Sequence, residues 1–229
     1  MEINEIGYLK TQFKTKFGVP RQSGIVKSSH ATLIFNEKYR NKESLKGLES
    51  YSHVWVIWGF SECRKTEFSP TVRPPRLGGN TRVGVFASRS PFRPNNLALS
   101  VLKIEKIEKT DKYGHVLHLS GADMMDMSPV YDVKPYLPQF DSIPDALGGF
   151  STEINDYLLN VNIPKDIVKR FDKEFINSLT EVLRQDPRPS YLDTPQRIFG
   201  FLYEDYEVKF TVDNKDLTVT YIEKQKQEF

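Results

Sequence analysis

The sequence predicts a mostly β fold with a smaller α+β region at its C-terminal end. Up to about Tyr136, apolar residues gather in many short strand-like segments separated by Gly, Pro, Asn and Asp. Many short strands with few helices are typical of a barrel or a sandwich. The one long helical pattern lies beyond residue 162. A chain of 229 residues is long enough for a full core and a companion domain.

The first part of the chain is predicted to consist of strands with one short helix. The helix is expected at Lys42–Leu48, where Asn41 is a favourable N-cap residue. The expected strands are Ile6–Lys10, Gly24–Lys27, Ala31–Phe35, His53–Phe60, Arg82–Ser88, Leu97–Glu108, Val116–Ser120 and Val130–Tyr136.

The second part is predicted to be α+β. The stretch Leu137–Asn162 contains prolines and paired glycines, so we expect a linker or a long lid there. An amphipathic helix follows from Ile167 to Leu183, with Asp166 near its N-terminus and Pro187 at its end. Two strands, Phe201–Val212 and Leu217–Glu223, then form a hairpin. We therefore expect domains at residues 1–145 and 146–229.

Composition restricts the class of protein. The net charge is only +2 and the pI about 8.4, so the whole surface is not a generally basic coat for nucleic acid. No apolar run could span a bilayer, and Met1 opens directly into strand-like sequence, so we expect a cytoplasmic protein. Cys63 is the only cysteine and the histidines show no ligand spacing, so we expect neither a disulfide nor a metal site. Rossmann, P-loop and G-x-S-x-G motifs are absent from the sequence.

Positive charge is concentrated in one segment. No acidic residue occurs between Glu67 and Glu105, and this stretch is rich in arginine, proline and glycine. Arginine grips phosphate and carboxylate with two donors, and proline beside glycine fixes loop backbone. We interpret the segment as an anion site; the alternative is a solvated basic loop. Its cations are Arg73, Arg76, Arg82, Arg89, Arg93 and Lys103.

Further clusters carry polar side chains next to prolines. VPRQSG (19–24) can present Gln22 and backbone amides, and GADMMDMSPVYDVKPYLP (121–138) holds Asp123, Asp126, Ser128, Asp132 and Lys134. DPRPSY (186–191) places Arg188 between prolines beside Tyr191, a combination suited to phosphate and an unstacked base. Taken singly, each cluster is better explained as a turn or a helix stop than as a binding site, because these residue types often serve turns.

Together, PRQSG, GLESYSHVWVIWGF, TVRPPRLGGNTRVGVFASRSPFRPNNLALS, DMSPVYDVKPYLP and DPRPSY resemble the TrmO-type tRNA (adenine-N6)-methyltransferases, or TsaA-like family, over nearly the whole chain. The resemblance implies a single-sheeted β-barrel that binds S-adenosylmethionine, a homodimer and a C-terminal domain involved in tRNA binding. It also implies N6-methylation of the threonylcarbamoylated adenosine 3′ of the anticodon in threonine tRNA. A barrel with Trp55 and Trp58 on one side would suit the dimer.

The resemblance also implies the site residues. The cofactor is expected to contact Pro20, Arg21, Gln22, Phe60, Ser61, Arg89, Leu99, Asp126, Met127, Ser128 and Pro129. The tRNA is expected to contact Arg76, Arg93, Asn95, Lys134, Arg188 and Tyr191. Asp126 is the candidate base for the N6 proton, with cofactor orientation as its alternative role.

Two other classes remain open from the sequence. A non-catalytic RNA-binding module would explain the arginine segment alone, and it would have no affinity for S-adenosylmethionine. A methyltransferase with another acceptor would keep the cofactor site but would not depend on threonylcarbamoyl-adenosine.

Overall fold

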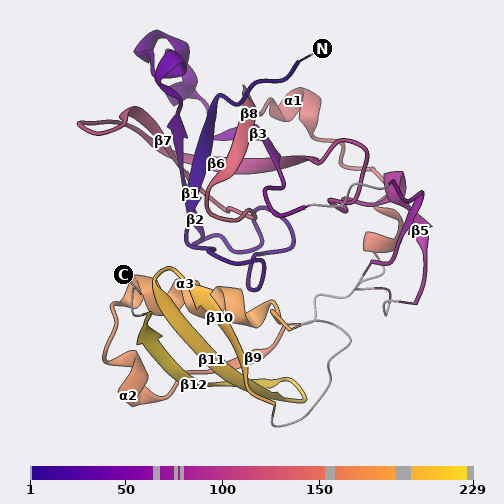
Figure 1. Cartoon of the computed structure of the whole chain (residues 1–229), viewed down its shortest axis with the longest axis vertical. Helices are drawn as coiled ribbons and strands as arrows, with labels where there is room; N and C mark the ends of the chain where they lie inside the picture. Colours follow the sequence, from indigo (N-terminus) through magenta and orange to yellow (C-terminus); the bar gives the residue numbers. More distant parts are fainter. Residues whose placement is uncertain are drawn as a thin grey trace.

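A computed structural model describes residues 2–63, 68–74, 77, 80–152, 158–188 and 197–225. Its first domain is a closed barrel in the strand order β1-β2-β7-β6-β3-β8, and its second is a sheet in the order β10-β11-β12-β9 (Figure 1). The expected mostly β architecture is confirmed. No helix among these residues is long and apolar enough to cross a membrane.

The barrel is closed by antiparallel pairing throughout, including that of β1 with β8. In β3 the buried residues Val54, Val56 and Trp58 alternate with half-buried Trp55 and Ile57, as expected for a strand with one face in the core. Trp55 and Trp58 therefore lie on opposite faces, not on one side. The barrel strands are β1 Gly7–Thr11, β2 His30–Phe35, β3 His53–Gly59, β6 Leu97–Thr110, β7 Gly114–Ser120 and β8 Ser128–Pro135.

Two predicted strands of the first domain are wrong. Gly24–Lys27 forms turns, in which Gly24 has a φ of 77°. Arg82–Ser88 contains only the two-residue strand β5 (Val83–Gly84), which pairs with β4 (Thr71–Val72), and then a 3₁₀ turn at Val85–Ala87. We call the described residues of segment 68–96 the arm; Figure 1 shows its β5 region beside the barrel. The expected helix at Lys42–Leu48 is a shorter 3₁₀ helix.

Local signals fix the smaller elements. The side chain of Asn41 accepts a hydrogen bond from the amide of Glu43, so the predicted cap is confirmed. The expected linker contains α1 (Pro138–Asp141), a 3₁₀ turn at Gly149–Ser151 and β9 (Asn160–Asn162). Further 3₁₀ turns lie at Glu37–Tyr39 and Leu48–Ser50.

In the C-terminal domain the predicted single helix is two helices, α2 (Lys165–Val168) and α3 (Lys173–Arg184). The break occurs because extended Asp172 caps α3 by accepting a hydrogen bond from the amide of Phe175. The sheet comprises β9, β10 (Phe199–Tyr203), β11 (Tyr206–Asp213) and β12 (Asp216–Lys224). The expected single strand Phe201–Val212 is therefore two strands, β10 and β11. β11 and β12 form the predicted hairpin.

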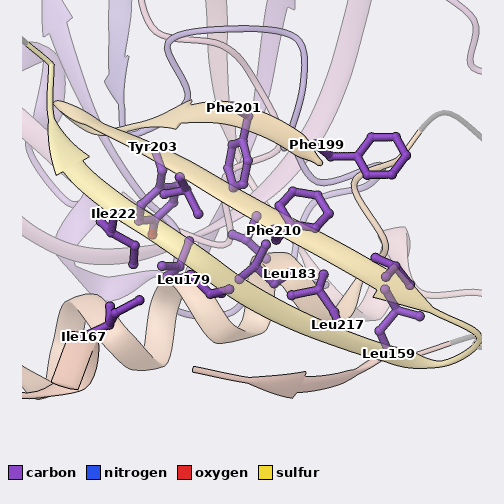
Figure 2. Packing of buried hydrophobic residues seen from close by; sticks show 14 of the residues in the cluster. Leu159, Ile167, Leu179, Leu183, Phe199, Phe201, Tyr203, Phe210, Leu217 and Ile222 are labelled. Atoms are coloured by element: carbon purple, nitrogen blue, oxygen red, sulfur yellow. The ribbon is translucent and has the colours of Figure 1, made fainter. Parts of the chain in front are cut away.

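The two domains share packing. Phe13 and Val26, from the loop between β1 and β2, belong to the core that α3 forms with the C-terminal sheet. Figure 2 shows part of this core, with Leu179 and Leu183 of α3 beside Phe210. A polar network closes the junction.

In that network, the side-chain amide of Gln12 donates to Tyr203 Oη at 3.2 Å and to Ser178 Oγ at 3.4 Å. Glu181 Oε2 accepts from the amide and hydroxyl of Ser28. These buried and part-buried contacts hold the C-terminal domain against the loop between β1 and β2.

Candidate active site

Two adjoining cavities lie at one end of the barrel, where β3 ends and β8 begins. The inner cavity has a volume of about 260 Å³ and the outer cavity about 760 Å³. Phe60, Ser61 and Phe92 line both, so these residues form the shared wall. Two adjoining cavities with a shared wall are the arrangement that a site for two reacting ligands requires.

The inner cavity combines an apolar wall with two carboxylate residues, Asp123 and Glu62. Asp123 is half-buried in it. Trp58 and Phe60 lie next to each other, with ring centroids 4.7 Å apart. The remaining lining residues are Lys16, Val19, Ser61, Glu62, Cys63, Pro91, Phe92, Met124, Met125 and Ser128. Such a lining suits a flat heterocycle with a few polar groups.

A hydrogen-bond chain from the barrel interior orients Asp123. The indole Nε1–H of Trp58 donates to Ser100 Oγ at 2.9 Å, and the Ser100 hydroxyl donates to Asp123 Oδ1 at 2.7 Å. Burial raises the pKa of Asp123 to about 6, while the hydrogen bonds from Ser100 and the backbone and the positive charge of Arg89 act in the opposite direction. This carboxylate therefore exchanges its proton at a pH closer to neutrality than an ordinary aspartate does.

The PRQSG loop is anchored beside Asp123 by two glycines. Gly24 donates its amide to the carbonyl of Gly121 at 2.9 Å, and both residues have positive φ, 77° and 81°. A Cβ on Gly121 would lie 3.2 Å from the Gly24 backbone. Only glycine permits this approach without strain. The loop then presents Gln22, whose Oε1 accepts a hydrogen bond from Arg89 Nη1 of the arm.

The outer cavity lies between the arm and the outer face of the barrel rim. Its aromatic lining residues are Phe60, Phe68, Phe92 and Tyr131. The remaining lining residues are Ile3, Gly59, Ser61, Arg93, Pro94, Asn95, Asn96, Leu97 and Pro129.

The wall of the outer cavity is braced internally. Arg93 Nη1 donates to the carbonyl of Ser88 at 2.8 Å, and Asn96 Nδ2 donates to that of Cys63 at 3.2 Å. The carbonyl of Asn96 accepts from the amide of Phe60. These contacts fix the arm on the end of β3.

The structure brings most of the expected cofactor residues to this end of the barrel. Phe60 and Ser61 line both cavities, Ser128 lines the inner one and Pro129 the outer one. Pro20 is buried next to Val19, which lines the inner cavity. The other expected cofactor residues on this end are Arg21, Gln22, Arg89 and Met127.

Asp126, the expected catalytic base, has a different environment. Its Oδ1 accepts from the amide of Thr11 at 2.9 Å, and its Oδ2 pairs with Lys14 Nζ at 2.7 Å. It lines neither cavity. Met127, with a φ of 62°, turns the chain between Asp126 and β8. Both oxygens therefore tie the turn to residues at and just beyond the end of β1. The catalytic role of Asp126 stays a prediction, and we propose Asp123 as an alternative candidate base.

Leu99 also lies elsewhere than expected. It is on the outer face of β6, opposite Ile57 and 50% exposed, whereas its neighbour Ser100 faces the interior. It lines neither cavity.

Among the expected tRNA residues, Arg93 and Asn95 line the outer cavity. Lys134 is on the outer face of the barrel, paired with Asp132 at 2.8 Å. The side chain of Arg188 is only 9% exposed and forms a two-pronged pair with Asp186, so it braces its own turn. Arg76 and Tyr191 lie outside the described residues.

Sequence reasoning did not predict the hydrogen-bond chain that joins Trp58, Ser100 and Asp123. Asp123 was visible as an acidic residue in the 121–138 cluster, but nothing local distinguished it from Asp126. Its partner Ser100 is on a strand that is distant in sequence. In the described part of the chain, no group of three His, Cys, Asp or Glu residues is arranged to hold a metal ion.

The fold and the site define a β-barrel protein with two adjoining cavities at one end of the barrel. Residues 8–142 match the tRNA-methyltransferase O N-terminal domain, and residues 157–225 match the TrmO C-terminal domain. The chain therefore belongs to the TrmO family.

Individual relatives agree with this assignment. The chain is 34% identical to the tRNA (adenine(37)-N6)-methyltransferase of Escherichia coli K12 over 230 residues, covering 97% of each chain. The alignment with a Pyrococcus abyssi relative, 31% identical over 136 residues, covers 59% of this chain and 68% of the relative; that protein bears the name "Probable S-adenosyl-L-methionine-binding protein". The crystal structure of TrmO from Pseudomonas aeruginosa superposes with a TM-score of 0.77 at 28% identity, covering 97% of this chain and 98% of that one.

Proposed function

We propose that the protein is an S-adenosylmethionine-dependent tRNA methyltransferase that methylates N6 of adenine 37. The observation that carries this proposal is the pair of adjoining cavities with one shared wall, in a chain of the TrmO family. One cavity can hold a methyl donor and the other a methyl acceptor. A non-catalytic RNA-binding module would need no buried carboxylate beside an apolar pocket.

The inner cavity fits the donor by its chemistry. S-adenosylmethionine supplies an electrophilic methyl group on a sulfonium centre. Trp58, Phe60 and Val19 offer apolar surface for its adenine, and Asp123 can accept hydrogen bonds from its ribose or its ammonium group. The positive charge of Arg89, which is held by Gln22, lowers the pKa of Asp123, and this guanidinium can pair with the carboxylate of the methionine moiety.

The residues of the chain contribute mainly by alignment. Attack of a neutral nitrogen on a sulfonium transfers the positive charge from sulfur to nitrogen without creating new charge, and the charge leaves with the N6 proton. Fixing the two reactants across one wall should therefore supply most of the acceleration. Ser61 and Phe60 make that wall rigid because the amide of Phe60 is bound to the arm. Asp123, with its pKa near neutrality, can take the N6 proton directly or through a water.

The arm supplies charge for the RNA. Arg73, Arg82 and Arg89 are exposed, and acidic residues are absent from this part of the sequence. Arginines of this kind hold phosphates and set the register of the RNA without reading its bases. We infer that the acceptor is the threonylcarbamoylated adenosine of threonine tRNA, as the resemblance implies.

We also infer that the protein is a homodimer. Leu99, Ile57 and Val101 form a partly exposed apolar strip on the outer face of β3 and β6. A second copy is the occupant that this strip would suit. Leu99→Glu should then shift the mass measured by light scattering to that of a monomer, and an unchanged dimer mass would remove this surface from the interface.

Methylation assays on two tRNA pools test the acceptor. Labelled S-adenosylmethionine is mixed with tRNA from cells with and without the threonylcarbamoyl modification. Incorporation only into the modified pool supports the proposal. Equal incorporation into both pools would show an enzyme that acts on another acceptor, and tRNA binding without incorporation would show a binding module.

A further inference from the structure

The outer cavity differs from the inner one in having aromatic rings together with amide side chains. Phe60, Phe68, Phe92 and Tyr131 come from three different parts of the chain and meet around one space of about 760 Å³. Asn95 lies on the same lining. Flat apolar surfaces beside a hydrogen-bonding amide are the two components with which proteins hold an unstacked base.

Two of these rings are unusually exposed. Phe68 is 59% and Phe92 43% exposed, although both face a cavity where apolar surface could be covered. Grouped exposed aromatics mark binding surfaces. Stacking of a base on such a ring does not depend strongly on which base it is, so the rings supply affinity and an amide must supply selection.

Asn95 is the residue available for that selection. Arg93 and Asn96 also line the cavity, but both are engaged in bracing the arm. Asn95 is exposed, and within the described part of the chain its side-chain amide takes part in no hydrogen bond. A carboxamide can donate and accept at once, which matches the edge of a purine.

Resting on the proposed function, we propose that the outer cavity receives the acceptor adenine, turned out of the RNA stack, with Phe68 stacking on the base and Asn95 bonding to its edge. The base would then lie against the shared wall at Phe60 and Ser61, with the methyl donor on the other side of that wall in the inner cavity. The arm thus has two functions: its arginines hold the RNA backbone and its rim selects the base.

The test uses variants that touch only the outer cavity. Phe68→Leu removes the ring, Phe68→Tyr keeps it, and Asn95→Ala removes the amide. Phe140→Leu is the matched control, because Phe140 of α1 is 74% exposed and lines neither cavity. Each full-length variant is assayed for melting temperature, S-adenosylmethionine affinity by calorimetry, tRNA affinity by filter binding, and single-turnover methylation at saturating cofactor and tRNA.

We expect Phe68→Leu and Asn95→Ala to methylate about 10-fold more slowly or worse, in line with the loss of one stacked or hydrogen-bonded base contact. Cofactor affinity and melting temperature should stay at the wild-type values. The tRNA affinity should fall less than the rate, because phosphate contacts dominate it. Phe68→Tyr, which keeps the ring, should be slowed less than Phe68→Leu, and Phe140→Leu should react at the wild-type rate.

Two results would overturn the assignment. Wild-type rates for both Phe68→Leu and Asn95→Ala would show that the base is bound elsewhere. A fall in cofactor affinity for these variants would show that the outer cavity holds part of the methyl donor. If the wild-type protein itself methylated no tRNA, the proposed function would fail first, and that result is distinct from a failure confined to the variants.

Discussion

Replacing Asp123 by Asn should make the protein more stable and less able to bind the cofactor. Burial raises the pKa of Asp123 from 3.8 to about 6. Because the folded-state pKa exceeds the unfolded value, the stability that the protonated form contributes is complete below about pH 4 and is lost as pH rises through 6. The difference between these pKa values corresponds to about 3 kcal/mol.

Asn mimics the neutral form of the side chain and keeps an acceptor for Ser100. At pH 8 the variant should therefore be more stable than wild type by about 2–3 kcal/mol, or roughly 4–12 °C in melting temperature for a chain of this size. At pH 4 the two proteins should have equal stability. The assay is urea denaturation of both proteins between pH 4 and 8, with calorimetric titration of S-adenosylmethionine at pH 7.5.

The comparison with wild type at each pH removes the contribution of every other titrating group. A stability difference that stays constant between pH 4 and 8 would refute the reasoning, because it would show that Asp123 titrates normally. Unchanged affinity of the Asp123→Asn variant for S-adenosylmethionine would show that the Asp123 carboxylate does not bind the cofactor.

Three further substitutions test roles assigned from the structure. Asp126→Asn should lower stability by only about 0.2–1 kcal/mol, because the Lys14 partner that is lost is exposed, while single-turnover methylation at saturating cofactor stays near wild type; a 100-fold slower rate would support Asp126 as the base. Arg188→Met should destabilise the C-terminal domain by about 3 kcal/mol, because Asp186 is left unpaired, with the salt dependence of tRNA binding unchanged; a flatter dependence would indicate a phosphate contact. Gly121→Ala should cost about 1–2 kcal/mol through its positive φ and should weaken cofactor binding by displacing the PRQSG loop; wild-type values for both would contradict the proposed anchoring.

The barrel strands were predictable because each combines alternating burial with nearby turn residues. Strand β3 shows this in the series Val54, Val56, Trp58, all buried. The segment Arg82–Ser88 contains similar apolar, strand-forming residue types, but it pairs with no larger sheet, and the side chain of Phe86 is 73% exposed. Strand propensity alone does not supply a partner strand, so the prediction failed where tertiary pairing was missing.

The candidate site was predictable in its location and not in its details. Asp123 and Asp126 carry the same local signal, and the structure separates them through partners far away in the sequence: Ser100 for one, Thr11 and Lys14 for the other. Side-chain direction in a turn depends on such long-range contacts. Pattern reading could place a carboxylate at the site, but it could not choose which one.

The same limit applies to the domain junction. Phe13 and Val26 read as ordinary residues of the first domain, yet they are buried in the core of the second. Arg188 reads as an exposed cation between prolines, yet Asp186 holds it in a buried pair. Composition identifies what a residue can do, and only the packing shows what it contacts.

Transfer of a labelled methyl group to a mapped position in tRNA tests the central claim most directly. Purified protein is incubated with methyl-labelled S-adenosylmethionine and tRNA from cells that lack the protein, and the labelled nucleoside is then identified and located. The two-cavity site predicts label on N6 of adenine 37. With Asp123 as the proposed base, the Asp123→Asn variant should transfer the label at least about 10-fold more slowly than wild type. Label at another base, or tRNA that binds without acquiring label, would contradict it.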